Sequence, residues 1–170
     1  KRMGITFDTW FSEQRELHET GEVARTLELL GQAGATYEQD GALWLKTTDH
    51  EDDKDRVLRK SDGELTYLAA DISYHLHKLA VRKFDRAINI WGADHHGYVA
   101  RLQAGLEQLR QPAGFEGTLE ILITQLVRLV ENGKEVKMSK RAGTYVALDD
   151  LLDEIPADVA RFFFVMKSFD

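Results

Sequence analysis

Cysteine is absent from the 170 residues, and its absence excludes several kinds of chemistry. Without thiols the chain has no disulfides, no thiolate metal ligands and no cysteine nucleophile. Only two prolines occur, and no apolar run approaches the roughly 20 residues that cross a bilayer. The basic N-terminus, KRMGITFDTW, also lacks the apolar stretch of a signal peptide. These absences fit a folded protein of the reducing cytoplasm, where we expect this chain to be.

Positive charge is also scarce, because 22 Lys and Arg face 29 Asp and Glu for a formal net charge of −7. A general nucleic-acid coat is normally basic overall, so any contact with nucleic acid or phosphate must be local. A hydrophobic content of 43% and a charged content of 30% are typical of a folded protein. The chain starts at Lys1 and stops within an apolar helical pattern, which we interpret as a segment of a longer protein.

The hydrophobic pattern predicts an α/β fold. We expect helices from Asp8 through Leu17, over residues 22–33, from Ala69 through Ala80, and over residues 99–111, 148–155 and 159–166, and strands over residues 42–48, 56–61, 65–67 and 86–92 and within 118–131. Pro112 should end its helix, and Asn132-Gly133 should form a hairpin turn. The order strand, glycine-containing loop, helix, strand is typical of an open α/β sheet, whose ligands bind at the carboxyl ends of the strands.

An acidic connector, DHEDDKDR at residues 49–56, joins two of the predicted strands. It has two interpretations, a solvated loop or a metal site. Clusters of charge are usually solvated, so we favour the loop.

Basic residues gather in VKMSKRAGTYV, residues 136–146. Lys137, Lys140 and Arg141 follow a predicted hairpin strand, and Gly143 gives the loop freedom to move. Lysines are compact charges that suit phosphate oxygens, especially where charge develops during nucleotidyl transfer. On spacing alone, a solvated basic turn remains the alternative.

The string Lys137-Met138-Ser139-Lys140-Arg141 resembles the Lys-Met-Ser-Lys-Ser signature of class I aminoacyl-tRNA synthetases, with Arg in place of the last Ser. FDTWFSE, DDKDRVLRKSDGELTYLAADISYH, GADHHGY and VKMSKRAGTYVALDDLLDEI together resemble the arginyl-tRNA synthetase family along essentially the whole chain. The resemblance implies the second half of a class I synthetase Rossmann-type nucleotide-binding fold, with an inserted β-hairpin region and C-terminal helices. It places residues 1–147 in the C-terminal half of the catalytic domain, and residues 148–170 in a helical linker toward an anticodon-binding domain.

The same resemblance implies that Lys137 and Lys140 are catalytic residues that also bind ATP. Lys140 would face the charge that develops on the α-phosphate, and Lys137 the outgoing pyrophosphate. Ser139 would donate a hydrogen bond to a phosphate, and Met138 would pack under the adenine or into the core. Mg²⁺ would accompany ATP, held mainly by phosphates and water, so we expect no protein-bound metal.

Tyr67 and Asp71 are expected at a strand-to-helix turn. An Asp at a helix start is by default an N-cap or first-turn residue. The resemblance implies instead that the pair holds the arginine side chain, and a carboxylate does match a guanidinium through two parallel hydrogen bonds. Relatives often have Thr or Pro where this chain has Ala69-Ala70, which affects local rigidity.

The segment GADHH is expected where a strand passes into a helix, the nucleotide position of such sheets. We expect Asp94 to accept ribose hydroxyls and Gly92 to allow close approach of the backbone to ATP. The resemblance places His95 in the pocket for arginine and the adenylate. For His96 and Tyr98, a packing or capping role is an equal alternative.

A metal bound by the Asp-His-His triplet, with His75 and His77 recruited, is the rival interpretation of this segment. Residues two apart on a helix point about 200° apart, so His75 and His77 cannot chelate together. No second Asp-x-Asp strand motif completes such a site. We therefore expect no metal here.

The resemblance implies an enzyme that activates arginine with ATP to arginyl-adenylate and transfers it to the 3′ end of its tRNA. In most of this family the cognate tRNA must be present before activation. The expected partners are tRNA(Arg), L-arginine and ATP, without a membrane, and the complete enzyme is expected to be a monomer.

The chain has no His-Ile-Gly-His element, so we expect it to be inactive alone. A non-catalytic synthetase-like binding module is the alternative, and another nucleotidyl transferase of the superfamily a weaker third.

Overall fold

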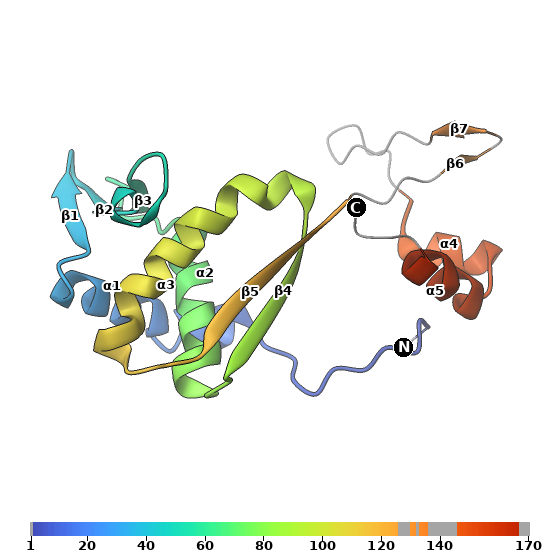
Figure 1. The fold of residues 1–170 in the computed structure, drawn as a ribbon, viewed down its shortest axis with the longest axis horizontal. Coiled ribbons are helices and arrows are strands. Elements are labelled where there is room, and N and C mark those ends of the chain that lie inside the picture. Colours follow the sequence, from blue (N-terminus) through green and yellow to red (C-terminus); the bar gives the residue numbers. More distant parts are fainter. Residues whose placement is uncertain (1, 126–129, 132, 136–145, 167–170) are drawn as a thin grey trace. The chain divides into compact units, whose positions relative to one another are not determined.

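A computed structural model describes residues 2–125, 130–131, 133–135 and 146–166. The chain forms two compact units: residues 11–123 make up the larger one, and residues 1–10 together with 124–170 make up the smaller (Figure 1). No helix within the described ranges is long and apolar enough to span a membrane.

An antiparallel sheet in the larger unit has the order β1-β2-β3. Its strands are β1 (Thr36–Gln39), β2 (Ala42–Leu45) and β3 (Arg56–Arg59), and the short helix η2 (Thr48–His50) follows β2. The turn between β1 and β2 is Asp40-Gly41, with φ of 53° and 75°, and this left-handed pair suits a two-residue hairpin. Sequence analysis missed β1, although Asp-Gly is a strong hairpin signal. The sheet is the inserted β-hairpin region that the resemblance implied.

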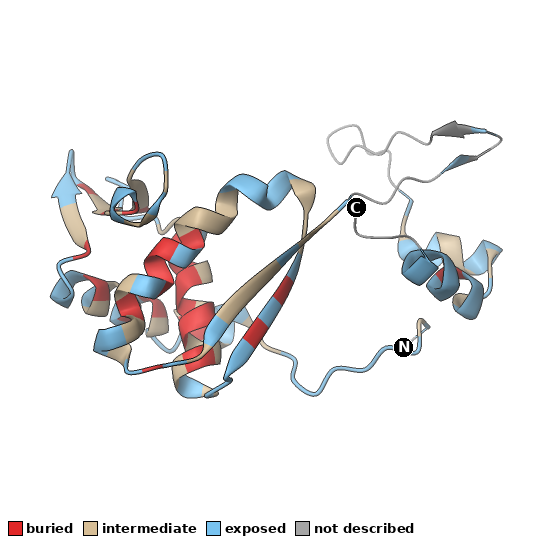
Figure 2. Cartoon of the chain, viewed as in Figure 1, coloured by how far each residue is buried: buried red, intermediate tan, exposed pale blue. Residues whose placement is uncertain are grey.

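Helices supply most of the core of the larger unit, as the buried positions in Figure 2 show. They are η1 (Gln14–His18), α1 (Glu22–Gln32), α2 (Tyr67–Leu76), its continuation η3 (His77–Val81), and α3 (Val99–Ala113). Leu17, Leu30, Ile72, Leu102 and Leu109 are fully buried. A Cβ added at Gly105 of α3 would collide with the Ile72 side chain of α2, so this glycine allows the two helices to pack closely.

A β-α-β unit follows α2 and η3. It consists of β4 (Arg86–Gly92), the short helix η4 (Ala93–Tyr98), α3, and β5 (Thr118–Thr124), with β4 and β5 paired. The starts of the two strands lie together: the Thr118 amide donates to the Asp85 carbonyl at 3.0 Å, and Arg86 pairs with Glu120. The strands therefore run parallel, which confirms the predicted α/β fold.

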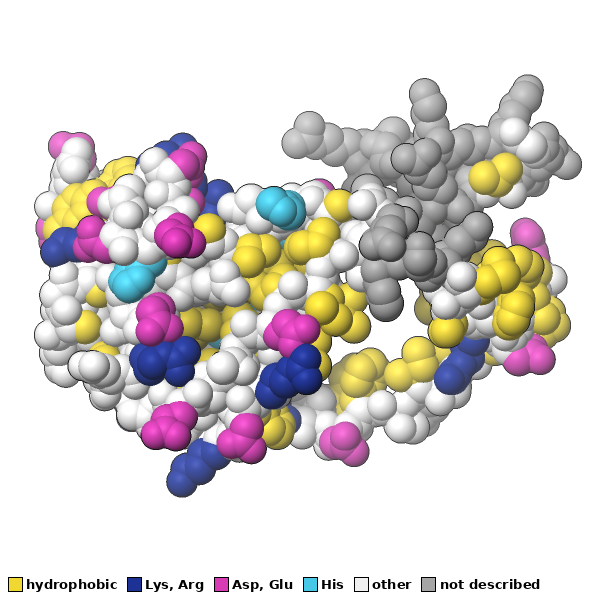
Figure 3. Space-filling model, in the orientation of Figure 1, with side chains coloured by type: hydrophobic (Ala, Val, Ile, Leu, Met, Phe, Trp, Pro, Cys, Tyr) yellow, Lys and Arg dark blue, Asp and Glu magenta, His cyan; other side chains and the backbone are white. Residues whose placement is uncertain are grey.

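The side chains of β4 alternate in burial, as expected for a strand. Ala87 and Asn89 are buried, whereas Ile88 and Ile90 are exposed. Leu122 of β5 is exposed as well, and Figure 3 shows hydrophobic side chains gathered over these two strands. One face of the pair thus lies against the core, and in the described part of the chain the other has no apolar cover.

Two expected boundaries near the core were wrong. The helix from Asp8 through Leu17 is helical only in η1, because residues 4–12 have no helical assignment. The strand over residues 65–67 is absent: Leu65 forms a single bridge with Arg59, and Tyr67 begins α2. The buried packing of α2 has overridden the β-propensity of Leu-Thr-Tyr.

The expected end of α3 at Pro112 was also wrong, because α3 runs to Ala113. Proline removes one backbone donor, and in the last turn this loss is small. The helix ends instead at Gly114, whose φ of 64° is left-handed and whose amide donates to the Gln111 carbonyl at 3.2 Å.

The smaller unit holds a short hairpin and two helices. They are β6 (Val130–Glu131), β7 (Lys134–Glu135), α4 (Leu148–Glu154) and α5 (Ala157–Met166). The strands pair antiparallel, which confirms the hairpin predicted around Asn132-Gly133. Arg2 forms ion pairs with Asp149 at 2.9 Å and Asp153 at 2.6 Å. Lys137, Met138, Ser139 and Lys140 of the basic loop lie outside the described residues, and the boundary at 147/148 stays a prediction.

Candidate functional site

One stripe of α2 and η3 carries polar and aromatic side chains that are exposed or only partly buried. Tyr67, Asp71, Tyr74 and Lys78 follow one another at spacings of four, three and four residues, which places them on one helix face. Leu68, Ala69, Ala70, Ile72, Ser73, His75 and Leu76 of α2 are buried. The side chain of Tyr67 is 87% exposed, and Asp71 is half-buried.

Asp71 is neither an N-cap nor a first-turn residue, and the expected strand-to-helix turn around Tyr67 and Asp71 was wrong. Both lie within α2, whose N-cap is Thr66, and the first turn holds no acidic residue. A carboxylate in the second turn cannot reach the free amides at the helix start. The default capping role is therefore excluded for Asp71.

Tyr98 contacts Asp71 although the two residues are 27 positions apart in the sequence. It is the last residue of η4, and its hydroxyl donates to Oδ2 of Asp71 at 2.6 Å. Burial raises the pKa of Tyr98, and the hydrogen bond to Asp71 raises it further. The phenol therefore stays protonated and acts as a permanent donor to the carboxylate.

The backbone of Asp71 is held by a second set of hydrogen bonds. His75 Nδ1 lies 2.7 Å from the Asp71 carbonyl oxygen and Nε2 lies 2.5 Å from Nδ2 of Asn89, while Lys78 donates to Oδ1 of Asn89 at 3.2 Å. Burial lowers the pKa of His75, and the charge of Lys78 lowers it further. A neutral ring that donates from Nδ1 and accepts at Nε2 satisfies all these contacts. This chain of bonds fixes α2 to β4.

Lys78 completes the polar stripe. Its ammonium lies 4.3 Å from the centre of the Tyr74 ring, a cation–π arrangement. Burial lowers the pKa of Lys78, and the nearby charge of Arg82 lowers it further. Lys78 is thus tied to Asn89 and Tyr74, whereas Asp71 has no Lys or Arg nitrogen of the described residues within ion-pair distance.

The predicted residues Gly92, Asp94 and His95 lie at the carboxyl end of β4. Gly92 has φ −68° and ψ 156°, a conformation open to any residue. Oδ2 of Asp94 lies 3.7 Å from Nε2 of His95, and these side chains are 62% and 59% exposed. The Trp91 ring lies 6.0 Å from the His95 ring and 5.8 Å from the Tyr98 ring, centre to centre.

The structure thus joins the predicted segments TYLAAD and GADHHGY through one hydrogen bond, from Tyr98 to Asp71. No hydrogen bond or ion pair among the described residues links Asp71 to Tyr67, Asp94 or His95. Sequence analysis missed Asn89 and left Tyr98 open. The alternation of β4 could have placed Asn89 on the buried face, but no local pattern pairs Tyr98 with Asp71.

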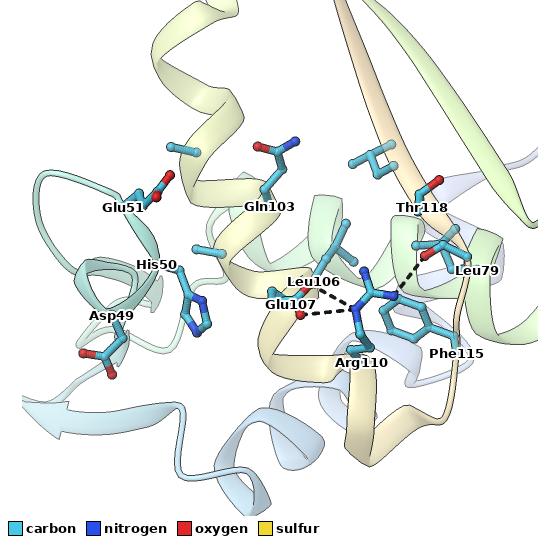
Figure 4. A pocket seen from close by; sticks show the side chains of 14 residues that line it. Asp49, His50, Glu51, Leu79, Gln103, Leu106, Glu107, Arg110, Phe115 and Thr118 are labelled. Atoms are coloured by element: carbon cyan, nitrogen blue, oxygen red, sulfur yellow. Dashed lines mark hydrogen bonds and ion pairs between the residues drawn. The ribbon is translucent and has the colours of Figure 1, made fainter.

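A hollow in the described structure lies elsewhere. It has a volume of about 500 Å³, and Figure 4 shows it between η2, α3 and the start of β5. Arg110 on its wall pairs with Glu107 at 3.0 Å and donates to the carbonyls of Glu116 and Gly117, so its charge is already compensated. None of the predicted site residues lines this hollow, and the chemistry favours the Asp71 group over it.

Carboxylates of the acidic connector, residues 49–56, form ion pairs and hydrogen bonds with neighbouring residues of the chain. The guanidinium of Arg56 lies 2.7 Å from Asp52 and holds the pKa of that carboxyl well below its usual range. Asp55 accepts from the amide and hydroxyl of Thr48 and from the hydroxyl of Tyr37. Among the residues that the structure describes, no group of three or more His, Asp or Glu is placed to hold a metal.

The fold and this site define an α/β protein with a carboxylate near the carboxyl end of a strand that forms no ion pair with the described residues. Residues 2–162 match the family described as tRNA synthetases class I (R), catalytic domain. The arginine–tRNA ligase of Aquifex aeolicus is 55% identical over 168 residues, covering 99% of this chain and 28% of the ligase. Arginine–tRNA ligase 1 of Halalkalibacterium halodurans is 52% identical over 167 residues, covering 98% and 29%.

A solved structure from Campylobacter jejuni, assigned as an arginyl-tRNA synthetase, has a TM-score of 0.84 and 40% identity. The match covers 99% of this chain and 35% of that one. The chain therefore belongs to the class I arginyl-tRNA synthetase family, through its catalytic domain. It spans about 28% of the length of the curated relatives that it matches.

Proposed function

We propose that these residues are part of an arginine–tRNA ligase, which forms arginyl-adenylate from arginine and ATP and transfers arginine to tRNA(Arg). We call the longer protein that contains them the complete ligase. We propose that it is a monomer, that it works in the cytoplasm and that it does not bind a membrane. The observation that carries the proposal is the carboxylate of Asp71, which Tyr98 holds and which forms no ion pair with a Lys or Arg of the described residues.

Asp71 binds the guanidinium of arginine in this proposal. An ionised carboxylate offers about four lone-pair positions, and Tyr98 occupies one of them. The remaining positions on both oxygens accept two parallel N–H groups, the geometry that distinguishes Arg from Lys. Tyr67, one turn earlier on the same helix face, borders the arginine side chain, and His95 of η4 lines the pocket for arginine and the adenylate.

ATP binds at the carboxyl end of β4 in this proposal. Asp94 accepts hydrogen bonds from the ribose, and Gly92 lets the backbone approach the nucleotide. Lys137, Met138, Ser139 and Lys140 take the roles that the family signature implies, and Mg²⁺ arrives with ATP on its phosphates and on water. Residues 148–170 then form the linker toward the anticodon-binding domain.

Pyrophosphate exchange into ATP tests the proposal. In the complete ligase, exchange should require L-arginine together with tRNA(Arg), and no other amino acid should replace arginine. The isolated 170-residue chain should show no exchange, because it has no His-Ile-Gly-His element. Exchange that depends on another amino acid overturns the proposal. Arginine binding to the complete ligase without any exchange favours the alternative, a non-catalytic binding module.

A further inference from the structure

Two neighbouring side chains pack against the ring of Tyr98 and hold it in place for the contact with Asp71. The centre of the Tyr98 ring lies 5.8 Å from the centre of the Trp91 ring, in an edge-to-face arrangement, and 5.3 Å from the guanidinium carbon of Arg101. Tyr98 is half-buried, and burial raises the pKa of its hydroxyl. The ring is therefore fixed before any ligand arrives, and so is the direction of its O–H bond toward Asp71.

A fixed donor on one oxygen orients the whole carboxylate. The terminal torsion of an aspartate is broad when nothing holds it, so a free carboxylate turns to meet a cation of any shape. The bond of 2.6 Å from Tyr98 to Oδ2 of Asp71 stops this rotation. A carboxylate is planar in any rotamer, so the bond fixes the direction in which this plane faces, which suits a planar group with two parallel donors. An ammonium is a point charge and gains little from this alignment.

We propose that Tyr98 is a positioning residue that makes Asp71 select a guanidinium over an ammonium. The inference rests on the proposed function, because it takes arginine as the ligand of Asp71. Tyr98 does not touch arginine in this scheme. It acts through Asp71, and its contribution is discrimination between arginine and lysine.

The chain offers a matched control for this inference. Tyr37 of β1 donates to Oδ2 of Asp55 at 3.0 Å, and burial raises the pKa of Tyr37 just as it does for Tyr98. The two pairs share the same chemistry, but Asp55 lies in the connector before β3 and holds Thr48. Tyr37→Phe therefore removes an equivalent hydrogen bond outside the proposed arginine site.

The experiment compares Tyr98→Phe and Tyr37→Phe with the unchanged complete ligase. Arginine-dependent pyrophosphate exchange gives kcat and the KM for arginine, and competition by L-lysine gives its inhibition constant. A hydrogen bond to a charged group typically corresponds to about 10-fold to 100-fold in binding. Tyr98→Phe should raise the KM for arginine by about 10-fold or more. The lysine constant should change by less than about 2-fold, because an ammonium does not need the fixed plane.

Tyr37→Phe should leave the KM for arginine and the lysine constant unchanged, and thermal midpoints of all three proteins show whether folding is affected. Equal losses for arginine and lysine in Tyr98→Phe, or an unchanged KM for arginine, overturn the positioning role while the proposed function stands. A ligase whose exchange does not depend on arginine overturns the proposed function, and this inference with it.

Discussion

Replacing Asp71 by Asn removes the charge of the proposed guanidinium site and keeps its shape. The Tyr98 hydroxyl donates to Oδ2 of Asp71 at 2.6 Å, and the amide oxygen of Asn can accept the same bond. Arginine then meets an amide that still offers acceptor positions on its oxygen but presents an NH₂ group to the second donor. The variant therefore loses one of two parallel bonds and the charge that assists both.

The size of this loss follows from the environment of Asp71. Removing one partner of a buried ion pair costs about 3–5 kcal/mol. Asp71 is half-buried rather than fully buried, so we take the lower end, about 3 kcal/mol, because solvent screens part of the interaction. With 1.4 kcal/mol per factor of ten, the KM for arginine should rise at least about 100-fold.

Stability should respond differently. Asp71 caps no helix and has no ion-pair partner among the described residues, so Asp71→Asn should change the thermal midpoint little. Arginine-dependent exchange in the complete ligase measures the KM, and differential scanning fluorimetry measures the midpoint. Asp55→Asn makes the same substitution in the other Tyr–Asp pair and should leave the KM for arginine unchanged. A wild-type KM in a stable Asp71→Asn protein refutes the assignment of the arginine pocket.

Three further predictions concern catalysis, packing and pH. Lys140→Ala in the complete ligase should lower kcat for exchange about 100-fold, as for loss of one transition-state contact, and a normal kcat with a raised KM for ATP contradicts this role. Gly117→Ala places a Cβ against the Phe84 carbonyl oxygen, and it should lower the free energy of unfolding, measured in urea, by about 1–3 kcal/mol. A Cβ added at Gly97 meets open space, so Gly97→Ala should leave this free energy unchanged. Burial lowers the pKa of His75 below its ordinary 6.5, so below pH 6.5 the unfolded state binds a proton more readily than the folded state. The free energy of unfolding should therefore fall by up to about 1.4 kcal/mol per pH unit as the pH is lowered from 6.5. The same dependence of this free energy on pH in His75→Gln contradicts the prediction.

The elements that sequence analysis placed well have a pattern that local physics decides. The strand RAINIWG alternates between the core face, with Ala87 and Asn89, and the open face, with Ile88 and Ile90. The helix after it has apolar residues at helical spacing, and a parallel partner strand follows. Such a sequence predicts a β-α-β unit without knowledge of the rest of the chain.

The errors arose where tertiary contacts decide. The segment Leu65–Tyr67 has the composition of a strand, yet Tyr67 begins α2 because the residues after it fill the core between α1 and α3. Tyr98 and Asp71 stand 27 residues apart. Their contact depends on how β4 docks on α2 through His75 and Asn89, and periodicity carries no information about such docking.

The two Tyr–Asp pairs show why residue type alone does not identify a site. The carboxylate of Asp55 accepts from Tyr37 at 3.0 Å and from the hydroxyl and amide of Thr48 at 2.8 Å and 3.1 Å, which fills most of its lone-pair positions. In the described structure the carboxylate of Asp71 accepts only from Tyr98. The acceptor positions of the Asp55 carboxylate are thus mostly filled by residues of its own loop and of β1. The carboxylate of Asp71 is oriented by Tyr98 and still has acceptor positions for a ligand. The unused hydrogen-bonding capacity of a fixed carboxylate, beside the end of β4, distinguishes the candidate site from its structural counterpart.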